Sequence, residues 1–395
     1  MFGMAKPPPQ PSGPTPPDKP HEYRDALPDG PLRGRGSTLN PGNRFESLRL
    51  HVLGEHLDHV RDPGEGEAPS SSAQAGTQVP TQVIPDQTRS ILNRVDSPDI
   101  PFNWSLNPYR GCEHGCVYCY ARPTHEYLGM NLGVDFETRI LVKHQAPALL
   151  RRELAKPAWK AEVISMAGNT DCYQPLEREL RITRGCLEVM AQCRQPVGIV
   201  TKNKLVLRDL DLLRELAAHD AVVVAVSVTT LDPQLAAKME PRASAPRDRL
   251  QAITALREAG VPVAAMIAPI IPALNDREVP ALLDAVAQAG AQWAGYVLLR
   301  LPWQIKELFS HWLTTHFPER AAHVLSLIRD TRGGELYDAR FGARMRGEGA
   351  FAQQIARLFK VHAARRGLDR SRWTLSGAHF RKPQDPPSPQ LSLFE

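Results

Sequence analysis

Apolar runs and amphipathic stretches alternate along the middle of this chain. Apolar runs such as AEVISMAG (161–168) and AVVVAVSVTT (221–230) predict strands. Stretches with apolar residues at helical spacing follow them, for example RGCLEVMAQC (184–193) and RDRLQAITALREAG (247–260). The strands show little alternation of polar and apolar residues, which is typical of a parallel sheet buried on both faces. The pattern therefore predicts an α/β domain.

The alternation extends over about six β/α units. The first strand is expected at FNWSLNP (102–108), and later strands at VGIVTKN (197–203), VPVAAMIAPII (261–271) and AGYVLLRLP (294–302). The connections have the lengths usual in α/β folds. A doubly wound sheet and a complete or partial barrel both fit this series, because periodicity alone does not distinguish them.

The N-terminal part of the chain has a different composition. Ten of the first 31 residues are prolines, and GEGEAPSSSAQAGTQ (64–78) is again rich in small and polar residues. Such segments bury too little apolar surface to fold. We expect residues 1–80 to be mostly disordered, with two exceptions: a basic arm at 33–46 and a short helix or strand at 47–57.

The other segment boundaries are placed where the hydrophobic pattern or the composition changes. The β/α units place the core at residues 100–310, and the chain after Trp303 is mostly helical. We expect a helical, basic extension at 311–383, including a helix at AFAQQIARLFKVHAARRGL (350–368). The proline-flanked residues 384–395 are expected to form a flexible tail.

Composition narrows the classes of function. The chain has 395 residues, 42% of them hydrophobic, and can bury a large core. It lacks the long apolar segment of a secretory signal near its start, and the run AVVVAVSV is too short to span a bilayer. We therefore expect a cytoplasmic protein without a membrane partner, whose thiols stay reduced. The net charge of +5 is a mild indication of a polyanionic partner.

Three of the six cysteines, Cys112, Cys116 and Cys119, lie within eight residues after the first predicted strand. A structural zinc ion needs four ligands and would have to add His114 or His125. A [4Fe–4S] cluster can be held by three cysteines, which leaves one iron free to bind a substrate or cofactor. In barrels the active site lies at the C-terminal ends of the strands, where this loop is expected. The cluster is favoured, and zinc remains the alternative.

The spacing Cys-x3-Cys-x2-Cys, with Tyr118 before the last cysteine, resembles the signature of the radical SAM superfamily. The resemblance implies a partial (β/α)6 barrel and a [4Fe–4S] cluster ligated by the three cysteines. It also implies S-adenosylmethionine at the open iron, cleaved reductively to a 5′-deoxyadenosyl radical. The electron would come from a reductant such as flavodoxin or ferredoxin.

Further segments resemble the spore photoproduct lyase branch of that superfamily. They are GNTD (168–171), VTK (200–202), VSV (226–228) and MEPRASAPRDRLQAITALREAGVPVAAMIAPI (239–270). The wider context of the cysteine motif resembles a bacterial group of uncharacterised radical SAM proteins related to that lyase.

Matching positions imply roles for individual residues. Tyr118 would lie against the adenine of S-adenosylmethionine. The other implied contacts are Thr170 and Asp171 with the amino group, Lys202 with the carboxylate, Ser227 facing the cofactor, and Pro269 and Leu299 in the adenine pocket. Structural alternatives remain: Asp171 as a helix N-cap, Ser227 bonded to backbone, and Lys202 solvated at a strand end.

One position departs from the lyase pattern. Spore photoproduct lyase has a hydrogen-donor cysteine three residues before the aspartate that matches Asp171, and this chain has Gly168 there. Cys172 is a candidate for a displaced donor or a small buried apolar residue. The lyase reaction is therefore not implied. Cys186 and Cys193 lie in a predicted helix and are expected in the core.

The last residues, QLSLF, resemble the pentapeptide by which bacterial DNA polymerases and repair proteins bind the sliding clamp. The resemblance implies that Gln390, Leu391, Leu393 and Phe394 contact an apolar groove on the clamp. Alternatively the tail packs on its own domain. Upstream, ARRGLDRSRWTLSGAHFRK (364–382) carries six basic residues interleaved with Trp373 and Phe380. That composition suits either nucleic acid with stacked bases or an ordinary solvated face.

These observations predict a radical SAM enzyme, lyase-like or of another reaction type, that acts on nucleic acid, with DNA as the leading substrate and a reaction related to DNA repair. One alternative is a radical SAM enzyme that modifies RNA, protein or a small metabolite, since the fold does not choose the substrate. The second alternative is a non-enzymatic metal-binding module tethered to the replication clamp.

Overall fold

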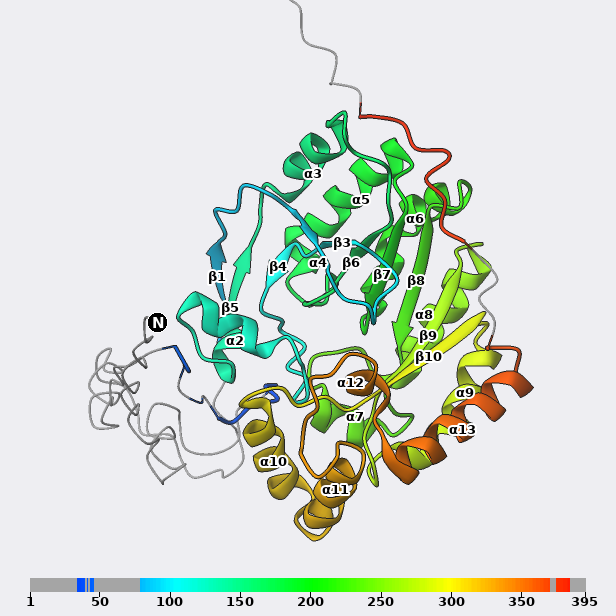
Figure 1. Cartoon of the computed structure of the whole chain (residues 1–395). Helices are drawn as coiled ribbons and strands as arrows, with labels where there is room; N and C mark the ends of the chain where they lie inside the picture. Colours follow the sequence, from blue (N-terminus) through cyan, green and yellow to red (C-terminus); the bar gives the residue numbers. More distant parts are fainter. Residues whose placement is uncertain (1–33, 40, 42, 46–78, 370–373, 384–395) are drawn as a thin grey trace, which may run out of the picture.

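A seven-stranded sheet forms the centre of the computed structural model, which describes residues 34–39, 41, 43–45, 79–369 and 374–383 (Figure 1). The strand order is β10-β9-β8-β7-β6-β3-β2. Six of these strands run parallel: β3 (Trp104–Leu106), β6 (Ile164–Met166), β7 (Val197–Thr201), β8 (Val222–Ser227), β9 (Val263–Ile270) and β10 (Trp293–Leu298). The short β2 (Leu92–Arg94) pairs antiparallel with β3 at the edge.

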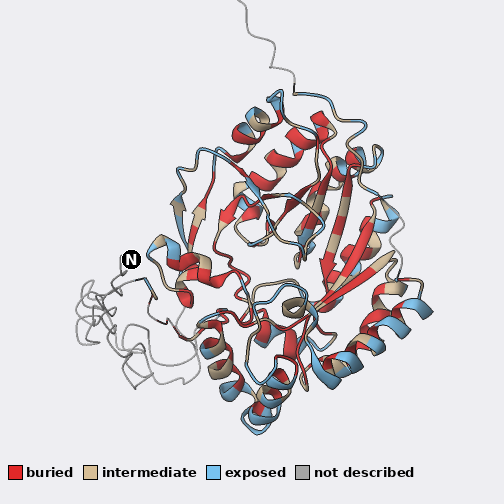
Figure 2. Cartoon of the chain, in the orientation of Figure 1, coloured by how far each residue is buried: buried red, intermediate tan, exposed pale blue. Residues whose placement is uncertain are grey.

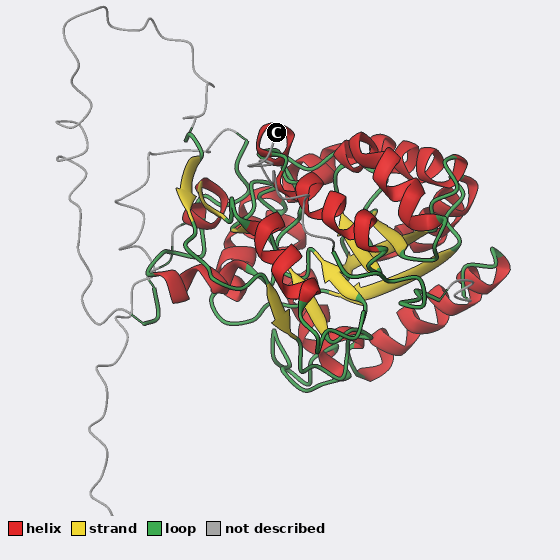
Figure 3. Ribbon diagram, turned by 90° about the horizontal axis from the view of Figure 1, so that it is seen from above, coloured by secondary structure: helices red, strands yellow, loops and turns green. Residues whose placement is uncertain are grey.

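The parallel strands neighbour one another in the order in which the chain makes them. A doubly wound sheet would reverse its strand order at a switch point. The sequential order therefore selects the partial (β/α)6 barrel expected from the resemblance. In the described part of the chain β10 and β2 are the edge strands. Figure 3 shows the strands with helices packed around them.

Helices between the strands cover the outside of the sheet and enclose the core (Figure 2). They are α3 (Ala146–Ala155), α4 (Glu177–Leu180), α5 (Ile182–Cys193), η3 (Lys204–Asp209), α6 (Leu210–Ala217), α7 (Pro233–Met239), α8 (Pro246–Glu258), η4 (Asp276–Glu278) and α9 (Val279–Gln288). The strands and the longer helices confirm the predicted β/α series, because apolar runs of this kind are stable only when buried. No helix of the described residues is long and apolar enough to cross a bilayer.

A second, small sheet lies next to the start of the barrel and was not predicted. Its order is β1-β5-β4, with β1 (Gln82–Pro85), β4 (Tyr109–Arg110) and β5 (Arg139–Val142). The elements η2 (Arg122–Leu128) and α2 (Val134–Thr138) lie between β4 and β5 in the chain. Strands of two to four residues carry too little periodicity to be read from sequence. Because β4 runs directly into the cysteine loop, this sheet anchors one end of that loop.

The chain after β10 is helical, as predicted. It forms α10 (Ile305–His316), α11 (Pro318–Asp330), α12 (Ala343–Arg346) and α13 (Gly349–Arg365). The helix expected at 350–368 is α13. Helices α10 and α11 share a second hydrophobic cluster with Val117 and Tyr118 of the cysteine loop. The C-terminal helices therefore form one wall of the candidate site.

The expectations for the two ends are tested only in part. Of the arm predicted at 33–46, residues 34–39, 41 and 43–45 are described. Gly36 and Ser37 bond to Glu137 of α2, Gly36 lies against Gly115 of the cysteine loop, and Arg44 bonds to Glu126 of η2. The segment 47–57 and the tail 384–395 lie outside the described residues.

Candidate functional site

Cys112, Cys116 and Cys119 lie on one loop at the C-terminal end of the first parallel strand. All three are unpaired thiols. Cys112 and Cys119 pack with Ala121 and Phe136, and Cys116 packs against the second hydrophobic cluster. Burial raises the pKa of each thiol, and the charges of Cys116 and Cys119 raise the pKa of Cys112 further. The three sulfur atoms are therefore close enough to interact.

The donor set fits a [4Fe–4S] cluster better than a single zinc ion. His114 is occupied by Asp171, 3.3 Å from Nδ1, and by Asn203 at 3.3 Å from Nε2. His125 uses Nε2 to bind the carbonyl of Arg139 at 2.9 Å, which leaves Nδ1 as its one ring nitrogen without a partner. Among the described residues, no three His, Cys, Asp or Glu side chains converge on a point that one metal ion could occupy. Zinc needs four ligand atoms about 2.0–2.3 Å from one point, whereas each cysteine of a cluster binds a different iron.

Gly111 brings the cysteine loop close to α2. It has φ +87°, and a Cβ added there would lie 2.8 to 2.9 Å from His125, Ile140 and the carbonyl oxygen of Phe136. The next residue, Cys112, donates its N–H to that same carbonyl at 2.9 Å. A side chain at position 111 would push the first cysteine away from this anchor.

A buried ion pair holds the middle of the loop to the N-terminal arm. Arg122 is fully buried, donates to the carbonyl of Cys116 at 2.9 Å, and pairs with Glu137. The carboxylate of Glu137 also accepts the backbone N–H groups of Gly36 and Ser37, each at 2.9 Å. The arm is thus part of the support of the cysteine loop, a role that its sequence did not predict.

Tyr118 is positioned by an acidic residue that sequence reasoning left without a role. Its hydroxyl donates to Glu240, which also accepts from Thr229 Oγ1 at 2.7 Å and pairs with Arg249. Burial acts to raise the pKa of Glu240, but the charges of Arg249 and Lys202 lower it to about 2. Glu240 and Arg249 lie inside the segment MEPRASAPRDR, so the resemblance covered them without explaining them.

Asp171 connects the ends of β6 and β7. Its Oδ1 accepts from Thr201 Oγ1 at 2.8 Å and from the N–H of Tyr173 at 2.9 Å, and its Oδ2 accepts the N–H of Lys202 at 2.7 Å. The bond to Tyr173 closes a local turn; Asp171 is not the helix N-cap considered as its structural alternative, because α4 begins at Glu177 with Leu176 as its N-cap. Burial acts to raise the pKa of Asp171, but the neighbouring His114 and these bonds lower it. The charge of Asp171 raises the pKa of Cys112, so the carboxylate is close to the cysteine loop.

The other predicted cofactor residues surround the same loop. The Lys202 ammonium lies 5.9 Å from the Tyr118 ring centroid, and no salt bridge of the described residues involves it. Thr170 donates its hydroxyl to the carbonyl of Tyr109 at 2.9 Å. Ser227 is buried at the end of β8, and its carbonyl accepts from Arg249 at 3.2 Å.

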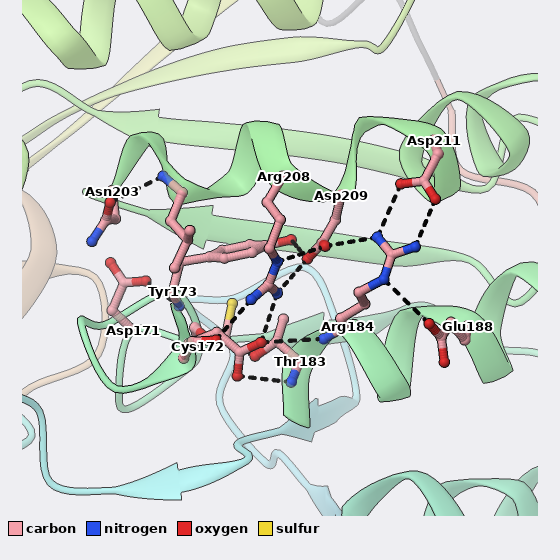
Figure 4. Close-up of polar contacts among 12 residues, drawn as sticks. Asp171, Cys172, Tyr173, Thr183, Arg184, Glu188, Asn203, Arg208, Asp209 and Asp211 are labelled. Carbon is pink, nitrogen blue, oxygen red and sulfur yellow. Dashed lines mark hydrogen bonds and ion pairs between the residues drawn. The ribbon is translucent and has the colours of Figure 1, made fainter. Parts of the chain in front are cut away.

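A buried network of ion pairs lies next to the loop that carries Asp171 (Figure 4). Arg208 pairs with Glu177 at 2.7 Å and with Asp209 at 2.8 Å. Asp209 also accepts from Tyr173 at 3.2 Å and from Arg184 at 3.0 Å. The network joins α4, α5 and η3 beneath the loop that carries Asp171.

Several predicted residues are not at this site. Cys186 and Cys193 are completely buried, which confirms the prediction that they are core residues. Cys172 is also completely buried in the main hydrophobic cluster. At Gly168 an added Cβ would meet only Ser105 Cβ at 3.6 Å, an ordinary contact.

The basic C-terminal segment lies at the other end of the sheet. Ser376 donates its N–H to Asp220, which precedes β8, and Arg381 donates to Cys193 at the end of α5. These contacts place residues 374–383 at the N-terminal ends of the strands, away from the cysteine loop. Trp373 and the candidate clamp-binding residues Gln390, Leu391, Leu393 and Phe394 lie outside the described residues.

Comparisons with known proteins agree with this geometry. The family model described as the radical SAM superfamily matches residues 106–286. An uncharacterised protein of Mycobacterium tuberculosis (strain H37Rv) is 39% identical over 244 residues, which cover 61% of this chain and 72% of that protein. An uncharacterised protein of Methanocaldococcus jannaschii is 29% identical over 238 residues, covering 60% of this chain and 85% of that protein.

Among solved structures the chain resembles spore photoproduct lyase. A mutant of that lyase with bound AdoMet and dinucleoside spore photoproduct has a TM-score of 0.52 and 17% sequence identity, covering 72% of this chain and 78% of the lyase. At this identity the likeness concerns the fold. The cysteine loop, the sequential parallel strands and the family match lead to one conclusion: this chain belongs to the radical SAM superfamily of enzymes, whose cofactors are a [4Fe–4S] cluster and S-adenosylmethionine and which require a reductant.

Proposed function

We propose that Cys112, Cys116 and Cys119 hold the [4Fe–4S] cluster of a radical SAM enzyme that acts on nucleic acid. The observation that carries this proposal is the arrangement of three unpaired thiols on one loop, with the Asp171 carboxylate and the Lys202 ammonium beside it. The radical SAM core is assigned to residues 100–310, and residues 311–383 are assigned to a helical extension.

Held by the three cysteines, the cluster would pass one electron from the reductant to S-adenosylmethionine, breaking its C5′–S bond to give methionine and a 5′-deoxyadenosyl radical that would take a hydrogen atom from the substrate. The protein binds S-adenosylmethionine and orients it. Lys202 receives the methionine carboxylate: its ammonium forms no direct salt bridge among the described residues, although its charge acts on the buried Glu240 carboxylate. Asp171 already accepts from Thr201, Tyr173, Lys202 and His114, so it receives the amino group by giving up one of these bonds, of which the 3.3 Å contact with His114 is the longest.

Tyr118, Thr170 and Ser227 shape the rest of the cofactor site. Tyr118 presents its ring to the adenine, and its bond to Glu240 holds the ring in place. The Thr170 hydroxyl donates to the Tyr109 carbonyl, and the N–H groups of Asn169 and Thr170 donate to Asn107 Oδ1, so the lone pairs of the hydroxyl oxygen remain for the cofactor. Ser227 lines the cofactor side of β8 next to the Arg249 contact.

The reaction differs from that of spore photoproduct lyase in its last step. Gly168 occupies the slot of the hydrogen-donor cysteine, and Cys172 is buried in the hydrophobic core. The final hydrogen atom therefore comes from another donor. The fold likeness to an enzyme solved with a dinucleoside lesion supports nucleic acid as the substrate class, and the net charge of +5 agrees with it.

The test is anaerobic cleavage of S-adenosylmethionine. The protein is reconstituted with iron and sulfide, reduced with dithionite, and assayed for 5′-deoxyadenosine. Cys119→Ala should lose both the cluster absorbance and the product. Cys186→Ala is the matched control, because this buried thiol lies in α5, and it should retain both. Zinc in place of iron, or equal product from Cys119→Ala, would overturn the assignment of the cysteines.

The substrate class has its own readout. Single-stranded DNA, duplex DNA and RNA are added in turn, and each is tested for faster 5′-deoxyadenosine formation. Acceleration by one of them supports nucleic acid. No acceleration by any of them, with cleavage intact, would favour a protein or small-metabolite substrate instead.

Two expectations rest on sequence alone. Clamp binding by Gln390, Leu391, Leu393 and Phe394 stays a prediction, because the structure does not describe the tail. Its test is binding of the full chain to a purified bacterial sliding clamp, with loss on Leu393→Ala and Phe394→Ala expected. The cytoplasmic location likewise stays a prediction.

A further inference from the structure

The large aromatic side chains exposed among the described residues share one feature: an arginine lies over each ring. These side chains are Phe45, Tyr120, Tyr127, Trp303 and Phe341, exposed by 45 to 68%. We call them, together with Arg44, Arg300 and Arg344, the arginine–aromatic surface.

The stacking distances are short. The guanidinium carbon of Arg44 lies 4.3 Å from the ring centroid of Trp303 and 4.7 Å from that of Phe45, and it also covers Tyr127 at 5.4 Å. The guanidinium of Arg300 lies 5.0 Å above Tyr120, and that of Arg344 lies 4.4 Å above Phe341. Each pair is within the range of a cation–π contact.

The rings come from segments that border the cysteine loop. Tyr120 directly follows Cys119, and Tyr127 lies in η2 a few residues later. Trp303 follows β10, at the C-terminal end of the sixth parallel strand, and Phe341 precedes α12 (Figure 1). The surface therefore surrounds the side of the barrel where the cofactor site lies.

Hydrogen bonds hold the separate segments in place. Glu126 Oε1 accepts from the N–H of Arg44 at 3.1 Å and from Gln304 Nε2 at 2.8 Å, which joins the arm, η2 and the start of α10. Tyr120 donates its hydroxyl to the carbonyl of Gly168 at the end of β6. The rings are thus presented by a rigid frame rather than left loose at the surface.

Ordinary packing does not explain this surface. A half-exposed aromatic ring gains little from burial, and an apolar surface left exposed is typical of a binding site. Trp303 also has φ +49°, a left-handed conformation that a non-glycine residue adopts only when its surroundings require it.

The charge of the surface is only partly neutralised. Arg44 and Arg344 pair with Glu126 and Asp99. Arg300 has no salt bridge among the described residues, its Nε is buried without a hydrogen-bond partner, and its guanidinium hydrogen-bonds only to the sulfur of Met345 there, at 3.5 Å. An anionic ligand would supply the missing acceptor.

We propose that the arginine–aromatic surface binds unpaired bases and phosphates of a single-stranded or locally opened nucleic acid and directs it toward the cysteine loop. Bases stack on aromatic rings and on guanidinium planes whatever their sequence, and phosphates bind arginine. The inference rests on the proposed nucleic-acid function and names the surface that would serve it.

The experiment measures fluorescence anisotropy of the reconstituted protein with a labelled 20-nucleotide DNA strand, its duplex, and an abasic strand of the same length. Trp303→Ala and Phe341→Ala remove exposed rings, and each should raise the Kd for the single strand about tenfold. Arg300→Gln should lower the slope of log K against log salt by about 0.7, the value for one phosphate contact on a single strand. Melting temperatures near that of the wild type show that these variants fold.

Matched controls lie on α13. Val361→Ala removes an exposed apolar side chain and Lys360→Gln an exposed cation, and neither should change the Kd or the salt slope. The wild type should bind the abasic strand about tenfold more weakly than the normal strand, and Trp303→Ala should reduce that difference.

The outcomes separate the role of the arginine–aromatic surface from the proposed nucleic-acid function. Wild-type binding that is unchanged in Trp303→Ala and Phe341→Ala would overturn the surface and leave the nucleic-acid function standing. Absence of wild-type binding to every oligonucleotide, with cleavage of S-adenosylmethionine intact, would overturn both and favour a protein ligand for these rings.

Discussion

The hydroxyl of Tyr118 donates a hydrogen bond to Glu240, which lies 122 residues further along the chain. Tyr118 belongs to the cysteine motif, and Glu240 follows α7 behind the fourth parallel strand. Glu240 in turn pairs with the buried Arg249. The ring proposed to face the adenine is therefore held by a buried ion pair, and the cysteine loop depends on the far side of the barrel for its shape.

This relationship predicts that Glu240→Gln destabilises the protein by about 3 kcal/mol, because it leaves the Arg249 charge buried without its partner. Urea denaturation at pH 7 measures the change. Adding Arg249→Met should recover most of the loss, since removing both charges of a buried pair is far less costly than removing one. A single variant as stable as the wild type would show that the pair contributes nothing.

Lys202 and Lys204 offer a matched pair for the cofactor site. Lys202→Met should weaken binding of S-adenosylmethionine at least tenfold, about 1.4 kcal/mol, because it removes the cation proposed to meet the carboxylate. Lys204→Met removes a surface salt bridge to Asp248 at 2.9 Å and should change the Kd by less than twofold. Anaerobic equilibrium dialysis measures both. Equal losses would contradict the role given to Lys202.

Alanine variants at Gly111 and Gly168 form a second matched pair, which tests the support of the cysteine loop. Gly111→Ala places a Cβ 2.8 to 2.9 Å from three neighbours at φ +87°, so the loop must move. We expect the reconstituted variant to hold less than half the iron of the wild type. At Gly168 the added Cβ makes only an ordinary contact of 3.6 Å, so Gly168→Ala should load fully. Iron and sulfide per chain are the measurement, and full loading of Gly111→Ala would show that the loop tolerates the shift.

The sequence predicted the parts of the fold that have local signals. Strands such as β8 and β9 are apolar runs buried on both faces, and α8 and α13 have helical periodicity. The strands of the second sheet have only two to four residues and were missed. Their pairing is set by tertiary contacts, which no short window of sequence contains.

The candidate site also contains residues that a local sequence signal predicts and residues that only the fold brings together. The three cysteines were found because their spacing is local, and the superfamily signature lies within eight residues. Glu137 bonds to Gly36 from 101 residues away, and Glu240 reaches Tyr118 from 122 residues away. Buried acids of this kind look like surface residues until the fold places them. Trp303 likewise became informative only when Arg44 was found above its ring.

His125 is the source of the last prediction, which concerns pH. Its ring is fully buried under the cysteine loop, and burial lowers its pKa from 6.5 to about 4, with the charges of Arg122 and Arg139 acting in the same direction and Asp135 opposing them. In the unfolded chain the imidazole takes up a proton below about pH 6.5, whereas in the folded protein it stays neutral until about pH 4. Protonation therefore favours the unfolded state across this window.

The stability contributed by neutral His125 is complete above pH 6.5 and is lost as the pH falls toward 4, to a total of about 3 kcal/mol. His125→Gln does not titrate and keeps a donor for the Arg139 carbonyl, so it should lose less stability between pH 7 and pH 4.5 than the wild type by about 2 kcal/mol. Urea denaturation of the apo forms at both pH values gives this difference directly. Parallel losses in the two proteins would mean that another group, and not His125, sets the acid sensitivity of the cysteine loop.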